Sequence, residues 1–162
     1  MKWDKTKDWF WEGNIQEKIK IYLKNNKFEI VKTSNTLSRE KGPDILAKKH
    51  NKIWRIAVKG YPSDKYVGNS SFGTKGKKKK TNPPIQARHW FSEALTEIIL
   101  AKCDDPSIEI ALGFPDFKIY KNLLSRISWL RKKLKIHSFI VSKLETKYFK
   151  PTEEIKKEAI NG

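Results

Sequence analysis

The chain has 162 residues, of which 38% are hydrophobic and six are Trp, so it has room for one compact domain with a modest core. Its 35 Lys and Arg against 18 Asp and Glu give a formal charge of +17, which indicates a polyanionic partner such as nucleic acid. The lone Cys103 excludes an internal disulfide and a multi-cysteine zinc site. With neither a signal peptide nor a long apolar run, we expect a cytoplasmic protein with no membrane segment.

Apolar periodicity in the first half of the chain predicts one helix followed by three strands. The predicted elements are an amphipathic helix over 13–24, a strand over 28–32, and a hairpin of strands 44–48 and 53–59 around a polar turn at 49–52. Residues 61–84 contain three glycines, three prolines and a run of four lysines, which predicts a long basic loop.

The second half of the chain alternates helices and strands, which is typical of a β-α-β unit with parallel strands. The predicted elements are a helix over 85–102, a strand over 108–113, a helix over 117–134 with Asp116 as its N-cap, and a strand over 136–141. We therefore expect an α/β protein with a mixed sheet flanked by helices. Residues 1–150 form its single domain and 151–162 a charged C-terminal tail, whose end from residue 153 is a loose helix.

The most informative stretch is Gly42-Pro43-Asp44-Ile45-Leu46 followed by Arg55-Ile56-Ala57-Val58-Lys59-Gly60. Residues alternate between the two faces of a strand, so Ala57 and Lys59 share one face and Ile56 and Val58 the other. Asp44 on the neighbouring strand then approaches the polar face. Its carboxylate is a hard oxygen ligand of the kind that Mg²⁺ prefers.

These two segments resemble the PD-(D/E)xK nuclease superfamily, and the expected element order is similar to its restriction-endonuclease-like α-β-β-β-α-β core from roughly residue 11 to 113. The later helix and strand extend that core. The resemblance implies a Mg²⁺-dependent DNA endonuclease, with Mn²⁺ as a substitute metal. It assigns metal binding to Asp44 and to an acid at position 57, with help from the Val58 carbonyl, and catalysis to Lys59.

Position 57, however, is Ala, as a single Glu-to-Ala change, natural or engineered, would leave it. The loss of one anionic ligand weakens metal binding and the electrostatic stabilisation of the transition state, so we expect the chain as written to be nearly inactive. Two alternatives stay open: a non-catalytic DNA-binding or structure-recognising module on the same scaffold, and an RNA-associated protein in which the motif is accidental. Many relatives act as homodimers, but the chain carries no interface signature.

Many members of the superfamily also place an acid on the first helix, facing the site. Glu12 and Gln16 lie one turn apart and fit that position, whereas Glu17 points elsewhere. Glu12 is the preferred catalytic and metal-binding candidate. In the alternative interpretation, it only complements the helix dipole.

Candidate nucleic-acid contacts follow the motif. They are Lys75, Lys77, Lys78, Lys79 and Lys80 in the basic loop, and Gln86, Arg88 and His89 at the start of the next helix. The alternative for the lysines is a solvated charge run. His89 and Glu93 have helical spacing for a metal but lack a third ligand.

Tryptophans form the last group of candidates. Trp3, Trp9 and Trp11, together with Phe10, either anchor the first helix, which we favour, or stack on bases. Trp90 and Trp129 lie on apolar helix faces, and we expect both in the core.

Overall fold

A single six-stranded sheet organises the protein, and its strands follow one another in chain order. The computed structural model describes residues 4–38, 42–63, 65, 78 and 82–158. The strands are β1 (Glu29–Thr33), β2 (Ile45–Lys49), β3 (Lys52–Val58), β4 (Glu109–Pro115), β5 (Ile136–Val141) and β6 (Thr146–Phe149). The helices are the short 3-10 helix η1 (Lys5–Lys7), α1 (Glu12–Asn25), α2 (Pro83–Asp104), α3 (Lys118–Arg126) and α4 (Ser128–Leu134).

The sheet is mixed because its connections are of two kinds. β1, β2 and β3 form an antiparallel meander, and the β2–β3 turn places His50 and Asn51 at φ 49° and 63°, as tight hairpin turns require. β3, β4 and β5 are parallel, which needs crossovers, and α2 and then α3 with α4 supply them. β6 returns antiparallel to β5. The expected α/β class with a mixed sheet flanked by helices is confirmed.

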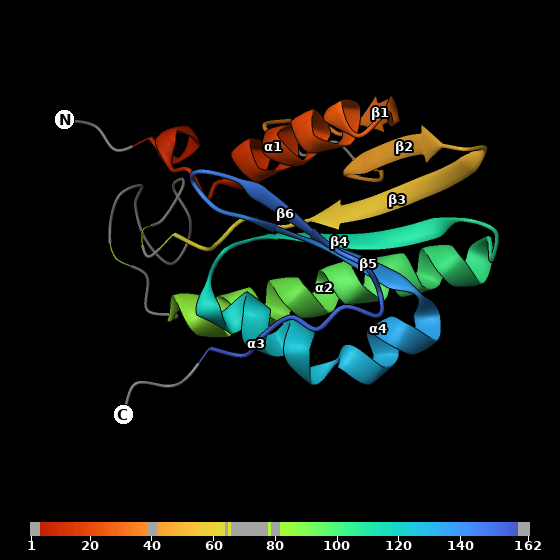
Figure 1. The fold of residues 1–162 in the computed structure, drawn as a ribbon. Coiled ribbons are helices and arrows are strands. Elements are labelled where there is room, and N and C mark those ends of the chain that lie inside the picture. Colours follow the sequence, from red (N-terminus) through yellow and green to blue (C-terminus); the bar gives the residue numbers. More distant parts are fainter. Residues whose placement is uncertain (1–3, 39–41, 64, 66–77, 79–81, 159–162) are drawn as a thin grey trace.

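Helices cover both faces of the sheet, with α1 on one side and α2, α3 and α4 on the other (Figure 1). The α1 residues Ile15, Ile19 and Leu23, spaced four apart, are fully buried and belong to one cluster with Ile56 and Val58 of β3. The even-numbered residues of β3 therefore face α1.

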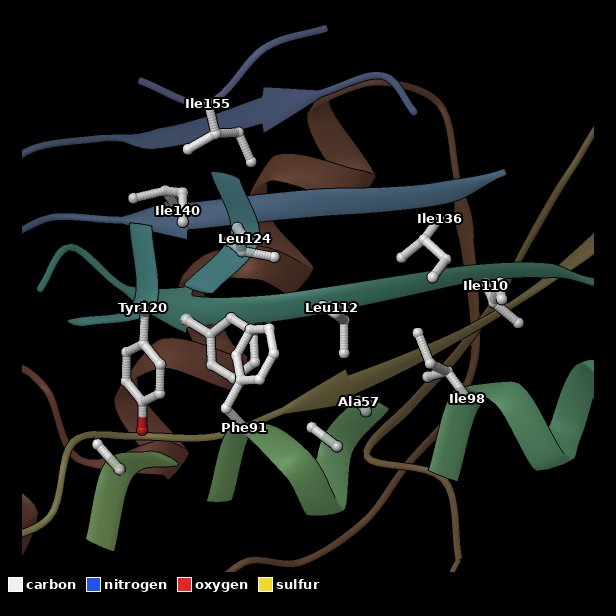
Figure 2. Packing of buried hydrophobic residues seen from close by; sticks show 13 residues of the cluster. Ala57, Phe91, Ile98, Ile110, Leu112, Tyr120, Leu124, Ile136, Ile140 and Ile155 are labelled. Carbon is white, nitrogen blue, oxygen red and sulfur yellow. The ribbon is translucent and has the colours of Figure 1, made fainter. Parts of the chain in front are cut away.

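The odd-numbered neighbour Ala57 faces the other layer. Figure 2 shows it in the larger cluster, near Phe91 and Ile98 of α2 and on the same side as Leu112 of β4. All of these side chains are buried, with Phe91 only 4% exposed and the others 0%. The expected alternation along β3 is confirmed by this division of Ile56 and Val58 from Ala57.

Three expectations for the end of the chain are wrong. The predicted helix over 117–134 is two helices that meet at Ile127, and β6 was not expected at all. Residues 153–158 form no helix; Ile155 is 4% exposed in the core, and the buried Arg131 donates hydrogen bonds to the carbonyl oxygens of Lys150 and Glu153. The C-terminal residues that the structure describes are thus held against the domain.

Two side chains also differ from their expected places. Trp129 is 72% exposed because the break at Ile127 turns α4 relative to α3, so the apolar face of a continuous helix does not exist. Asp116 does not cap α3, whose N-cap is Phe117 without a side-chain hydrogen bond; Asp116 instead pairs with Lys121 at 2.7 Å. No helix in the described part of the chain has both the length and the apolar character needed to cross a bilayer.

Gly60 lets the segment before α1 approach the end of β3. A Cβ at this position would lie 2.5 Å from the carbonyl oxygen of Phe10 and 2.6 Å from the amide nitrogen of Glu12, and both are backbone atoms. The Tyr61 amide donates to that same Phe10 oxygen at 3.0 Å. Only glycine permits this approach, so Gly60 fixes where α1 begins relative to β3.

We therefore expect Gly60→Ala to lower the free energy of unfolding by about 1–3 kcal/mol, the usual cost of overpacking. Gly113→Ala is the control, because its Cβ would clash with the end of the Ile19 side chain at 2.4 Å, while a backbone atom near it, the Ala57 carbonyl oxygen, is at 3.8 Å. Urea unfolding measures both, and amide chemical shifts of residues 10–12 should move only in Gly60→Ala. Unchanged shifts there would contradict the role given to Gly60.

Candidate functional site

The start of α1, the start of β2 and the end of β3 meet at one cavity of about 440 Å³. Glu12 is the first residue of α1, Asp44 directly precedes β2, and Lys59 directly follows β3. All three side chains line the cavity, and they come from different segments of the chain. The structure thus brings together the three charged residues that the sequence singled out as catalytic.

Asp44 is held by two hydrogen bonds from the layers around it. Its carboxylate oxygen Oδ2 accepts from the Val58 amide at 2.7 Å, which ties the start of β2 to the end of β3. Its carbonyl oxygen accepts from Nε2 of Gln16 at 2.7 Å, and the same nitrogen donates to the Ser34 carbonyl at 3.0 Å. Gln16 is 3% exposed, so it serves as a buried link between α1, the end of β1 and the start of β2. Glu17 faces solvent and pairs with Lys20.

Burial dominates the electrostatics of the two carboxyl groups. Burial, together with the negative charge of Asp44 and against the positive charge of Lys59, raises the pKa of Glu12 to about 7. Burial also raises the pKa of Asp44 to about 6, against the lowering effect of the hydrogen bond from Val58. Two neighbouring carboxyl groups are therefore less acidic than usual, as expected of a partly desolvated site that lacks a full countercharge.

Ala57 does not line the cavity. Its side chain is 0% exposed, between β3 and α2 (Figure 2). The neighbours of Ala57 on the same face form ion pairs with α2. A guanidinium nitrogen of Arg55 lies 3.5 Å from a carboxylate oxygen of Glu97, and Nζ of Lys59 lies 3.4 Å from a carboxylate oxygen of Glu93. The face on which a longer residue 57 would lie is thus bordered by two α2 carboxylates and covered by apolar side chains.

The donor set can be compared with what a divalent ion needs. Among residues 4–38, 42–63 and 82–158, no group of three or more His, Cys, Asp or Glu side chains is close enough to enclose a metal ion. Mg²⁺, however, keeps several waters and is commonly held by one or two carboxylates together with substrate phosphates. Asp44 and Glu12 are two such carboxylates in one cavity, so the residues present fit a Mg²⁺ ion that the substrate helps to bind.

The residues expected to contact nucleic acid lie apart from this cavity or outside the described chain. Lys78 is exposed and forms an isolated antiparallel bridge with Lys65. Arg88 and His89 are exposed and Gln86 is half-buried on the early turns of α2, and none of the three lines the cavity. The other lysines of the run lie outside the described residues, namely Lys75, Lys77, Lys79 and Lys80.

Sequence reasoning missed the contribution of α2. Glu93 and Glu97 lie one turn apart on one face of α2, and Arg55 and Lys59 lie on one face of β3 and the residue that follows it. Charge pairing between a helix and a strand could have been proposed from these two spacings. Trp90 was expected in the core, but it is only half-buried and lines the cavity.

We compared the chain with protein-family models, curated proteins and solved structures, and none of them matches it.

The pKa of Glu12 makes a prediction about stability. A raised pKa in the folded state means that folded protein binds more protons than unfolded protein between about pH 4.5 and 7, so stability falls as the pH rises through this window. Glu12→Gln removes the buried charge. We expect this variant to be more stable than the parent at about pH 8, by on the order of 3 kcal/mol at most, and equal to it at about pH 4.

Urea unfolding at the two pH values measures this difference. Glu17→Gln, which changes an exposed carboxylate of the same helix, is the matched control and should not show the pH dependence. A Glu12→Gln variant that is less stable than the parent at the higher pH would show that the Glu12 charge is compensated.

Proposed function

We propose that the protein is a Mg²⁺-dependent DNA endonuclease of the PD-(D/E)xK type, in a form whose catalysis is strongly impaired by Ala57. The observation that carries the proposal is the common cavity of Glu12, Asp44 and Lys59, reached from one helix and two strands. These are an acid from the first helix, the motif aspartate and the motif lysine, in the roles that the resemblance gives them.

The element order supports the same proposal. α1, the meander β1–β2–β3, α2 and β4 follow one another as in a restriction-endonuclease-like core. α3, α4 and β5 then extend the sheet, and β6 closes its other edge. Fold alone does not establish an activity, so the proposal depends on the cavity.

The chemistry can be divided among the residues present. Asp44 and Glu12 would hold Mg²⁺ or Mn²⁺, which would neutralise charge developing on a phosphodiester and make a bound water more acidic. Val58, whose carbonyl the resemblance adds to the ligands, is buried and does not line the cavity. The Lys59 ammonium orients that water or stabilises the charge on the phosphate oxygens. Its partner Glu93 is 65% exposed and moves away at little cost when a phosphate approaches. The net charge of +17 supplies attraction to DNA.

One observation favours a second candidate, a DNA-binding module without catalysis. Ala57 is packed under α2, so its side chain contributes nothing to the cavity. Of the acids that the resemblance assigns to the metal, only Asp44 and Glu12 line the cavity, and Lys59 is partly neutralised by Glu93. In that case the cavity and the positive charge bind a nucleic-acid backbone without cutting it.

A substitution at residue 57 separates the two candidates. Ala57→Glu restores the missing carboxylate, and we expect metal-dependent nicking of plasmid DNA to rise by about 100-fold or more, the scale of a lost electrostatic contact in an active site. Mn²⁺ affinity, measured by calorimetry, should rise with it. Adding Lys59→Ala to Ala57→Glu should abolish the nicking.

Ala57→Gln is the matched control, because it adds the same volume to a buried position without the charge. Thermal unfolding of both variants shows whether α2 accommodates the larger side chain. If Ala57→Glu folds as well as Ala57→Gln but gains neither Mn²⁺ affinity nor cleavage, the non-catalytic module is the better description.

A further inference from the structure

The cavity is bounded by aromatic side chains as well as by charges. Four of them line it: Phe10, Trp11, Tyr61 and Trp90. They come from the segment before α1, the segment after β3, and α2, so they surround the charged residues from both helical layers. Aromatic rings in the same cavity as Lys59, Glu12 and Asp44 need a separate explanation.

Two of these rings belong to a packed wall. Tyr61 stacks on Phe117 with ring centroids 3.8 Å apart, and Phe10 meets both of them edge to face. Trp9 also stacks on Phe117, with ring centroids 5.5 Å apart. Trp9 and Phe10 thus form the hydrophobic anchor that was favoured for the aromatic cluster at the start of the chain, Trp11 is not part of it, and Trp3 lies outside the described residues. The anchor fixes one side of the cavity.

The other two rings are arranged differently. Among the described residues, Trp11 and Trp90 make no ring contact with another aromatic side chain, although both are half-buried and line the cavity. Trp11 lies over Gly13, whose added Cβ would be 2.2 Å from the indole ring. Glycine at this position therefore leaves room for the indole against the first turn of α1. Two indole side chains are thus held at the site with no aromatic partner in the part of the chain that the structure describes.

Indole faces next to phosphate-binding charges suit a nucleobase that has left its stack. Base–aromatic stacking is available only to unstacked bases, since the faces of bases in a continuous duplex are already covered. A cavity of about 440 Å³ is also in the range that encloses a small ligand, about 300–1,000 Å³, and a continuous duplex is far larger.

We propose that this site takes DNA with an unpaired nucleotide at the reacting phosphate, that is, single-stranded DNA or the single-stranded end of a duplex. The inference rests on the proposed function of the cavity and names its substrate class. Lys59 contacts the phosphate directly, and Glu12 and Asp44 would contact it through the metal ion. Trp90 and Trp11 stack on the adjacent base. A blunt duplex meets only the positive surface.

The test compares binding of labelled oligothymidine, a duplex with a single-stranded overhang, and a blunt duplex of equal nucleotide count, followed by fluorescence anisotropy without metal. We expect the first two to bind at least about 10-fold more tightly than the blunt duplex. Trp90→Ala should weaken their binding by about 5- to 100-fold and leave the blunt duplex unchanged. Trp90→Phe, which keeps an aromatic face, should restore most of the loss.

Trp129→Ala is the matched control, because Trp129 is 72% exposed on α4 and does not line the cavity. Quenching of the native tryptophan fluorescence by oligothymidine, and not by the blunt duplex, tests the same contact without a mutation. Equal affinity for the three DNAs, with Trp90→Ala like Trp129→Ala and no selective quenching, overturns the substrate class while DNA binding stands. If none of the three DNAs binds even at low salt, the proposed function itself fails.

Discussion

The hydrogen bond from the Val58 amide to the Asp44 carboxylate is the interaction on which the site depends. β2 begins one residue after Asp44 and β3 ends at Val58, so a side chain takes up a backbone donor where the strand pairing stops. The bond fixes the carboxylate beside Lys59, the next residue of the chain. It also favours the ionised form of a group whose burial disfavours it. Gln16 holds the same corner from α1, so helix and strands cannot shift independently.

Local patterns in the sequence predicted most of the fold. The helical spacing of Ile15 and Ile19, the alternation along β3 and the polar turn after Lys49 each report on neighbours within a few residues, and these elements were found within two residues of their bounds. The break at Ile127 and the strand β6 were not predicted, because they depend on how the chain packs against β5 and the rest of the domain. Tertiary contacts decide such features, and a local pattern does not contain them.

The residues of the candidate site also fall into those that local patterns predict and those that only the structure reveals. Asp44 and Lys59 were found because a short motif on adjacent strands carries its own geometry, and Glu12 because it stands one turn before Gln16 on the first helix. The contribution of α2 was missed because the spacing of residues within a helix does not determine which of its faces packs against a distant strand such as β3. For that reason, Glu93 and Trp90 entered the site only with the structure, and the burial of residue 57 against α2 became visible at the same point.

The account stands on the convergence of two carboxylates and one lysine around a divalent ion. A crystal structure of the native chain grown or soaked with Mn²⁺ tests it most directly, because manganese is located by its anomalous scattering. The account predicts an anomalous peak between the carboxylates of Asp44 and Glu12, with the Lys59 ammonium on the same side and waters completing the shell. A peak elsewhere, or Asp44 and Lys59 side chains that point into separate spaces, would contradict it.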